Sequence, residues 1–201
     1  KSLFVFGGNS GANIVFEIGK KSYKQIFYTN TYANNIEEAY IKEYEYAIDS
    51  IKNKNNDYFV ATGDNLMRKE ISESLIKLTK KNPTNIISES SIINTKKIGF
   101  GNLITSGAVI NIDTDIGNGT IINSNSTVEH GSIIQNYSQI SPGVTLGGRV
   151  SIGENTFVGL NSTVLTDISI CKNVLIGAHS LVIENISVEG TYVGSPCKKI
   201  K

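Results

Sequence analysis

The sequence predicts an α/β chain, with a small βαβ-type (Rossmann-like) N-terminal domain followed by a parallel β-helix of about six coils. Two observations carry this prediction. Before residue 83, short apolar runs alternate with segments of helical spacing. From Ile86 to Val188, every sixth residue is Ile, Val or Leu, without exception. A period of six fits neither a helix nor a flat strand, so it indicates a chain that turns a corner every six residues.

The β-helix is expected to occupy residues 84–201. Three hexads complete one coil of 18 residues, so residues 18 apart should stack about 4.8 Å apart, like neighbouring strands of a sheet. The fifth residue of most hexads is small, as at Ser126 and Ser138, which suits the inside of a narrow corner. Glycines such as Gly117 and Gly153 recur at the second or fourth position, where we expect the corner to need the backbone freedom of glycine.

Residues 1–83 are predicted to form the first domain, built on a parallel sheet. Asp64 is expected to cap the third helix of this domain at its N-terminus. The segment Asn82-Pro83-Thr84 marks the boundary with the β-helix. The expected strands are residues 3–6, 25–28 and 58–62, and the expected helices are residues 12–20, 37–52 and 66–80.

Composition excludes several partners and compartments. The net charge is +1 and no long cluster of Lys and Arg occurs, so we expect neither nucleic acid nor an anionic membrane as a partner. No apolar run reaches the length of a membrane span, and the first apolar run is too short for a signal peptide. Cys171 and Cys197 are far apart, without metal-type spacing, which favours two reduced thiols in a cytoplasmic protein.

Two hexads and the C-terminal segment carry a family resemblance. The hexads begin Ile116-Gly117-Asn118-Gly119-Thr120 and Ile152-Gly153-Glu154-Asn155-Thr156, and the chain ends near Gly194-Ser195-Pro196-Cys197-Lys198. This pattern resembles the hexapeptide-repeat acyltransferases. The resemblance implies a left-handed parallel β-helix and a homotrimer with active sites between subunits.

The N-terminal domain narrows the resemblance to one subgroup. The segments Phe4–Gly11 and Phe59–Asn65 look like those of bacterial acyltransferases that modify sialic acid or nucleotide-linked 4-amino sugars. The resemblance implies an acetyl-CoA-dependent N-acetyltransferase of surface-glycan biosynthesis that acts on the amino group of a nucleotide-linked 4-amino sugar, without a metal. Two alternatives stay open: O-acetylation of sialic acid or another surface sugar, and a non-catalytic β-helix that serves as a binding or assembly module.

His130 is the candidate general base, because the subgroup places its catalytic histidine in a matching segment. An imidazole can accept a proton near neutral pH from an amine or hydroxyl that attacks the thioester carbonyl. Relatives of the amino-sugar type have an acidic residue directly after this histidine, whereas this chain has Gly131. The group that orients His130 is therefore open between Glu129, a backbone carbonyl and a residue of another subunit.

Coil spacing adds Gly148, which is 18 residues beyond His130 and should lie directly above it. A glycine there would leave room for the pantetheine arm or the acceptor, although a corner that simply needs glycine would look the same. By resemblance, acetyl-CoA would also contact Gln139, Leu160 and Ala178.

The loop between the first strand and the first helix is the candidate site for the nucleotide part of the acceptor. Backbone N–H groups at a helix N-terminus can bind a phosphate, although the loop lacks the full dinucleotide fingerprint. Relatives have acidic residues where this chain has Thr29 and Asn30. The substrate-binding residues implied by the resemblance are Asn9, Ser10, Gly11, Ala12, Thr29, Asn30 and Gly63.

Overall fold

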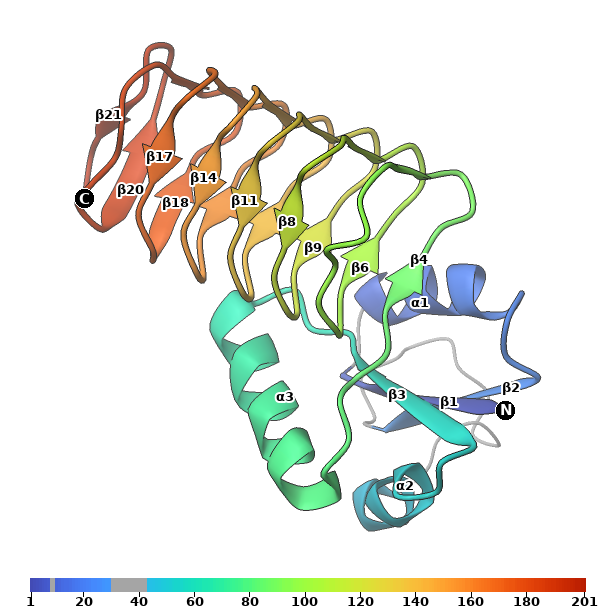
Figure 1. Cartoon of the computed structure of the whole chain (residues 1–201). Helices are drawn as coiled ribbons and strands as arrows, with labels where there is room; N and C mark the ends of the chain where they lie inside the picture. The colour runs from blue at the N-terminus through green and yellow to red at the C-terminus, as the bar shows by residue number, and fades with distance from the viewer. Residues whose placement is uncertain (8–9, 30–42) are drawn as a thin grey trace. The chain divides into compact units, whose positions relative to one another are not determined.

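The computed structural model describes residues 1–7, 10–29 and 43–201. Its Cα trace divides into two compact units, Lys1–Ile86 and Ile87–Lys201. Among the described residues, the first unit contains the helices α1, α2 and α3, and the second is a stack of coils that runs from green to red in Figure 1. None of the helices in the described parts of the chain is long and apolar enough to cross a membrane.

The first unit is built on a three-stranded parallel sheet in the order β2-β1-β3. Its core contains the aromatic side chains of Phe4, Phe6 and Tyr58, which are buried. Because β1 is central, the chain first builds outward to β2 and then crosses to the other side for β3. The elements are β1 (Ser2–Phe6), α1 (Ser10–Gly19), β2 (Gln25–Thr29), α2 (Tyr44–Ile51), β3 (Asn56–Val60) and α3 (Asn65–Thr79).

The third helix follows the sequence prediction, whereas the strand before it ends early. Asp64 caps α3, because its carboxylate accepts a hydrogen bond of 2.8 Å from the Met67 N–H. Strand β3 ends at Val60 rather than at residue 62, because its partner β1 ends at Phe6, which pairs with Val60. Residues 37–42 of the expected second helix lie outside the described residues.

The coils of the second unit form three sheets, one on each side of a triangular prism. Their strands are parallel except for the last one, β21, which pairs antiparallel with β20. Strands of successive coils pair directly, as Thr127 does with Thr145 and Val128 with Leu146, so most coils contain 18 residues. The six-stranded sheet contains β5 (Ile92–Ile93), β7 (Val109–Ile110), β10 (Thr127–Val128), β13 (Thr145–Leu146), β16 (Thr163–Val164) and β19 (Leu181–Val182). The four-stranded sheet contains β8 (Asp115–Ile116), β11 (Ile133–Ile134), β14 (Ser151–Ile152) and β17 (Ser169–Ile170). The eight-stranded sheet contains β4 (Ile86–Ile87), β6 (Leu103–Ile104), β9 (Ile121–Ile122), β12 (Gln139–Ile140), β15 (Phe157–Val158), β18 (Val174–Ile176), β20 (Gly190–Val193) and β21 (Lys198–Lys199).

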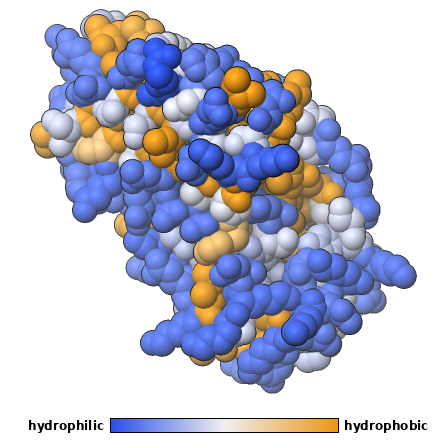
Figure 2. All heavy atoms as spheres, viewed as in Figure 1, coloured by the Kyte–Doolittle hydropathy of each residue, from blue (hydrophilic) through white to orange (hydrophobic). Residues whose placement is uncertain are grey.

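The aliphatic column forms the core of the coils. From Ile104 to Val182, every sixth side chain is no more than 2% exposed, which confirms the inward column over this range. Full burial of one such side chain stabilises a fold by about 1.5–3 kcal/mol, so the column supplies most of the apolar burial of this unit. On the face of the molecule that Figure 2 shows, apolar and hydrophilic side chains are interspersed.

The prediction fails at both ends of the column. Ile92 is 56% exposed, and Ile93 takes its place by pairing with Ile110. Val188 is likewise 56% exposed, and Ile186 pairs with Ile170 instead. The first and last coils are therefore shorter than 18 residues, and a column extended by sixes through them points the wrong side chain inward.

The corners contain two kinds of special position. A positive φ recurs at every sixth residue from Gly101 to His179, always at the fourth hexad position. Glycines at this fourth position, such as Gly119 and Gly131, have a positive φ, as expected. The glycines at the second position are not in this conformation, so the expectation of backbone freedom is wrong there. They are needed for space, because a Cβ on Gly153 would lie 2.4 Å from the carbonyl carbon of Cys171 on the next coil.

The small residues at the fifth hexad position face the inside of the corners, as predicted. Ser126 and Ser138 are fully buried. The Ser138 hydroxyl donates a hydrogen bond of 2.7 Å to the Gly153 carbonyl of the next coil, so burial leaves it with a partner.

Candidate active site

His130 lies just after β10, on the corner that leads to β11. The corner is tight because Gly131 adopts a φ of +69°, which glycine reaches without steric cost. The side chain of His130 is exposed to solvent. The fold therefore presents this imidazole on the outside of the prism.

Gly148 lies against the His130 ring, as the coil spacing predicts. A Cβ on Gly148 would be 2.8 Å from Nε2 and 2.9 Å from Cε1 of His130. The Arg149 N–H also donates a hydrogen bond of 2.8 Å to the His130 carbonyl. Gly148 has no positive φ, so the backbone of the corner does not call for glycine, whereas a larger side chain would displace the His130 ring. A contact with acetyl-CoA at Gly148 stays a prediction.

Glu129 is half-buried and its carboxylate is used within the β-helix. Its Oε2 accepts a hydrogen bond of 2.9 Å from the Asn111 side chain of the preceding coil. Within the described residues, no hydrogen bond joins the Glu129 carboxylate to the His130 ring. The structure thus brings Glu129 and His130 together in sequence but directs their side chains to different neighbours.

Two charged residues beside this corner were not identified from the sequence. The Arg149 guanidinium forms a fork with Asp167, with Nε to Oδ1 at 2.6 Å and Nη2 to Oδ2 at 2.8 Å. Hydrogen bonds from Arg149 lower the pKa of Asp167, and the charges of Arg149 and His130 act in the same direction. The spacing could have revealed them, because Arg149 and Asp167 lie 18 and 36 residues beyond Gly131.

The remaining acetyl-CoA candidates lie elsewhere on the prism. Leu160 and Ala178 are exposed and occupy one position of successive coils, on the corner between the eight-stranded and six-stranded sheets. Gln139 lies on β12 of the eight-stranded sheet. Within one chain, the six-stranded sheet separates Leu160 and Ala178 from His130.

In the first unit, several predicted residues gather where β1 and β3 end. A Cβ on Gly7 would lie 2.8 Å from the Thr62 hydroxyl oxygen, so the loops after these two strands are in contact. Gly11 and the buried Ala12 lie in the first turn of α1. Gly63 is exposed with open space around it. In open parallel sheets, the point where the strand order reverses is the usual ligand crevice, and here that point lies between β1 and β3.

A buried arginine fixes the second of these loops. Arg68 is 1% exposed, and its guanidinium donates hydrogen bonds to the carbonyls of Thr62 at 2.9 Å and Gly63 at 3.2 Å, and to the Asn65 side chain at 2.7 Å. Sequence reasoning missed Arg68, because an arginine in a helix is normally expected on the surface.

Of the other predicted acceptor residues, the structure describes Thr29 and Ser10. Thr29 is buried, and its hydroxyl donates a hydrogen bond of 3.3 Å to the Val5 carbonyl, so its side chain already has a partner in the fold. Ser10 is the first residue of α1. Asn9 and Asn30 lie outside the described residues.

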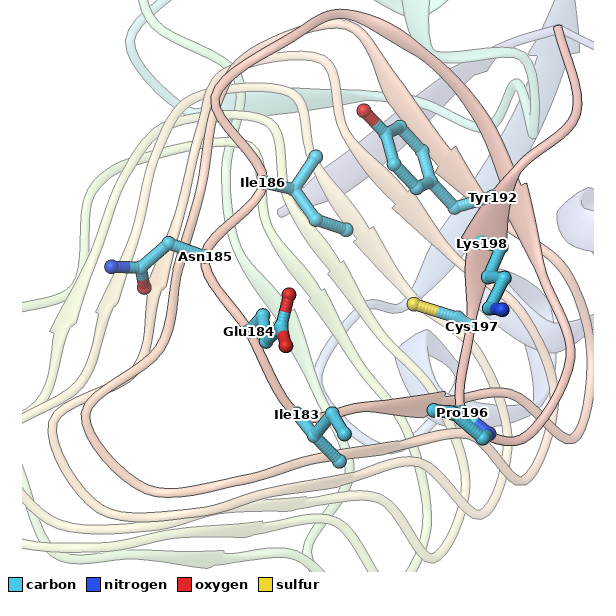
Figure 3. A pocket seen from close by; sticks show the side chains of 8 residues that line it. All are labelled: Ile183, Glu184, Asn185, Ile186, Tyr192, Pro196, Cys197 and Lys198. Atoms are coloured by element: carbon cyan, nitrogen blue, oxygen red, sulfur yellow. The ribbon is translucent and has the colours of Figure 1, made fainter.

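A cavity of about 180 Å³ lies at the C-terminal end of the coils (Figure 3) and contains none of the predicted site residues. Cys197 lines it, and burial together with the Glu184 carboxylate raises the pKa of its thiol. A protonated thiol is a poor nucleophile. The described residues contain no group of three or more His, Cys, Asp or Glu placed to hold a metal ion.

The six-residue repeat of the sequence corresponds to the sides of three-sided coils in the structure. Residues 113–148 match the family model for the bacterial transferase hexapeptide (six repeats). This segment includes His130 and Gly148.

Solved structures share the architecture of the whole chain. The acetyltransferase domain of PglB from Neisseria gonorrhoeae, in complex with acetyl coenzyme A, has 23% identity and a TM-score of 0.90 over 99% of this chain and 98% of that one. PerB from Caulobacter crescentus, in complex with CoA and GDP-perosamine, has 23% identity and a TM-score of 0.88 over 100% and 98%. WeeI from Acinetobacter baumannii has 18% identity and a TM-score of 0.83 over the full length of both chains. These similarities confirm the predicted fold, an α/β domain followed by a left-handed β-helix.

Proposed function

We propose that the protein transfers an acetyl group from acetyl-CoA to the amino group of a nucleotide-linked 4-amino sugar, in the biosynthesis of a surface glycan. The observation that carries this proposal is the exposed His130 ring, which rests on Gly148 inside the matched hexapeptide segment. Within the described residues, no hydrogen bond occupies either ring nitrogen. The similar structures that contain acetyl coenzyme A, or CoA with GDP-perosamine, support the same co-substrate and acceptor class.

In the proposed mechanism, His130 acts as the general base. The acceptor nitrogen attacks the thioester carbonyl carbon while His130 takes a proton from that nitrogen, a contribution of about 10²–10⁴-fold to the rate. The new C–N bond forms, the C–S bond breaks, and the imidazolium returns its proton to the CoA thiolate. A backbone N–H stabilises the developing oxyanion. Glu129 keeps the corner in place through its hydrogen bond with Asn111.

The acceptor nucleotide is proposed to bind where β1 and β3 end. The N-terminal N–H groups of α1 open at this edge and favour a phosphate. Gly11, Ala12 and Gly63 shape the site, and Arg68 holds the Thr62–Gly63 loop by two hydrogen bonds. We include Asn9, Ser10, Thr29 and Asn30 in this proposed site, and we place the reaction in the cytoplasm.

A homotrimer is part of the proposal, because one chain separates the two groups of acetyl-CoA candidates. The outward side chains of the six-stranded sheet are uncharged, which suits burial against another subunit. Packing around this sheet would bring the Leu160 and Ala178 corner of one subunit toward His130 of the next. The outward residues are Ile92, Val109, Thr127, Thr145, Thr163 and Leu181.

An acceptor panel tests this function. Release of the CoA thiol is measured with UDP- and GDP-linked 4-amino sugars, and in parallel with sialic acid and its CMP form. Turnover of the amino sugars supports the proposal, and His130→Ala should lower kcat by about 100-fold or more. Turnover of sialic acid alone would replace N-acetylation by O-acetylation. Failure to bind acetyl-CoA, measured by calorimetry, would leave only a binding or assembly role.

A further inference from the structure

The residue after His130 begins a row of three stacked residues, one on each of three successive coils. Gly131, Arg149 and Asp167 occupy the same position of three successive coils, and all three have a φ between +58° and +69°. A Cβ on Gly131 would lie 3.1 Å from Cγ of Arg149. The stem of Arg149 therefore fills the space beside position 131, and an acidic side chain there would have to displace it.

Backbone hydrogen bonds connect this row to the histidine. The Arg149 N–H donates to the His130 carbonyl at 2.8 Å, and the Asp167 N–H donates to the Gly148 carbonyl at 2.9 Å. Because the His130 ring lies on Gly148, Asp167 is bonded to the residue that supports the ring. The bidentate fork from Arg149 fixes the direction of the Asp167 carboxylate.

Charged side chains of both signs occupy the corner of His130 on successive coils in the described structure. The Glu129 carboxylate points back to Asn111 and is bonded there. Asp167 is the carboxylate whose pKa is lowered in part by the charge of His130, after the larger effect of its hydrogen bonds with Arg149. It therefore stays ionised throughout the range in which an imidazole titrates. The charged residues on this corner are Lys96, Lys97, Asp113, Glu129, Arg149, Asp167 and Glu184.

We propose that Asp167, held by Arg149, is a positioning residue for His130 that stabilises the imidazolium during acetyl transfer. This inference rests on the proposed function. The proton moves from the acceptor nitrogen to His130 and then to the CoA thiolate, and Asp167 itself neither gains nor loses one. Because Gly131 follows the histidine directly, the carboxylate that serves His130 would come from two coils further on.

A titration of the histidine rings tests the pairing without substrate. The chain has two histidines, so ring NMR signals of the full-length protein are assigned with His179→Gln. Removing the negative charge with Asp167→Asn should shift the titration midpoint of His130 to lower pH. Asp167→Glu keeps the charge, so its midpoint should lie close to that of the wild type. Glu189→Gln is the matched control, because Glu189 accepts a hydrogen bond from Asn173 of the preceding coil on a different corner.

The same variants are then assayed for acetyl transfer. Asp167→Asn should lower kcat by about tenfold, part of the general-base contribution, and should move the acidic limb of the pH–rate profile to lower pH. The KM for acetyl-CoA should change less than twofold. An unchanged titration midpoint of His130 in Asp167→Asn would overturn the inference. The Arg149–Asp167 ion pair would then only connect neighbouring coils. A shifted midpoint in a protein that acetylates no acceptor would uphold the pairing and reject the proposed function.

Discussion

The imidazole of His130 occupies the space where a side chain of Gly148 would lie, with Nε2 2.8 Å from that Cβ position. This relationship connects the repeat to the chemistry, because a coil of 18 residues places a glycine directly over the candidate base. The ring contacts the Gly148 backbone on one side and is otherwise exposed to solvent. A base held in this way has less freedom to rotate than a histidine on a loop.

Gly148→Ala should therefore displace the ring and lower kcat by about 10–100-fold, since a misplacement of about 1 Å can cost 10²-fold. The reason is steric, so the protein should fold as before. The control is the same change in a His130→Ala background, measured with the same substrates. Equal further losses in both backgrounds would show that Gly148 acts independently of His130.

A second glycine tests packing of the coils and not catalysis. A Cβ on Gly153 would lie 2.4 Å from the Cys171 carbonyl carbon, and backbone cannot move aside as a flexible side chain can. Gly153→Ala should lower the free energy of unfolding by about 1–3 kcal/mol, the usual cost of overpacking. Gly63→Ala is the matched control, because its Cβ would meet nothing within 4 Å. Equal urea midpoints for the two variants would contradict the explanation that Gly153 is needed because a Cβ has no room there.

Arg68 offers a test of the acceptor site in the first unit. Arg68→Met keeps much of the buried stem but leaves the carbonyls of Thr62 and Gly63 without this donor. A hydrogen bond to a charged group contributes about 1.5–3 kcal/mol, so thermal unfolding should occur at lower temperature. The KM for the acceptor should rise severalfold while the KM for acetyl-CoA stays within twofold. A rise in the acetyl-CoA KM alone would place the acceptor elsewhere.

The sequence predicted the β-helix because each side of a coil is six residues long and points one aliphatic side chain inward. The inward column from Ile104 to Val182 followed from that period, and so did the position of Gly148 over His130. The ends failed because the first and last coils have fewer residues, and nothing in the uninterrupted six-residue pattern records a change of register. Ile92 and Val188 are aliphatic by pattern but lie outside the core.

The charges beside the candidate base were harder to predict. Glu129 precedes His130 in sequence, yet its carboxylate bonds to Asn111 on the preceding coil. Arg149 and Asp167 meet because both adopt a positive φ on stacked coils, a backbone state that sequence reasoning assigns to glycine, asparagine or aspartate and not to arginine. Local neighbours in sequence were therefore a poor guide to neighbours across coils.

The last prediction concerns alkaline pH and the first unit. Burial, followed by the hydrogen bond to Asp57, raises the pKa of Tyr23 to about 12, and burial with the charge of Glu17 raises the pKa of Tyr28 to about 12. Both values exceed the ordinary 10 of an unfolded chain, so the folded state holds these protons longer. The resulting stability is fully present below pH 10 and is lost as the pH rises through 12.

Urea unfolding measured from pH 9 to pH 12 should therefore show a falling free energy of unfolding. Tyr23→Phe removes one of the two ionisable groups, so the slope above pH 10 should become shallower even though the hydrogen bond to Asp57 is lost at every pH. Tyr44→Phe is the matched control, because that side chain is exposed and its ring packs edge-on against Phe6. If Tyr23→Phe and wild type lose stability at the same rate above pH 10, the proton on Tyr23 is not what links the fold to pH.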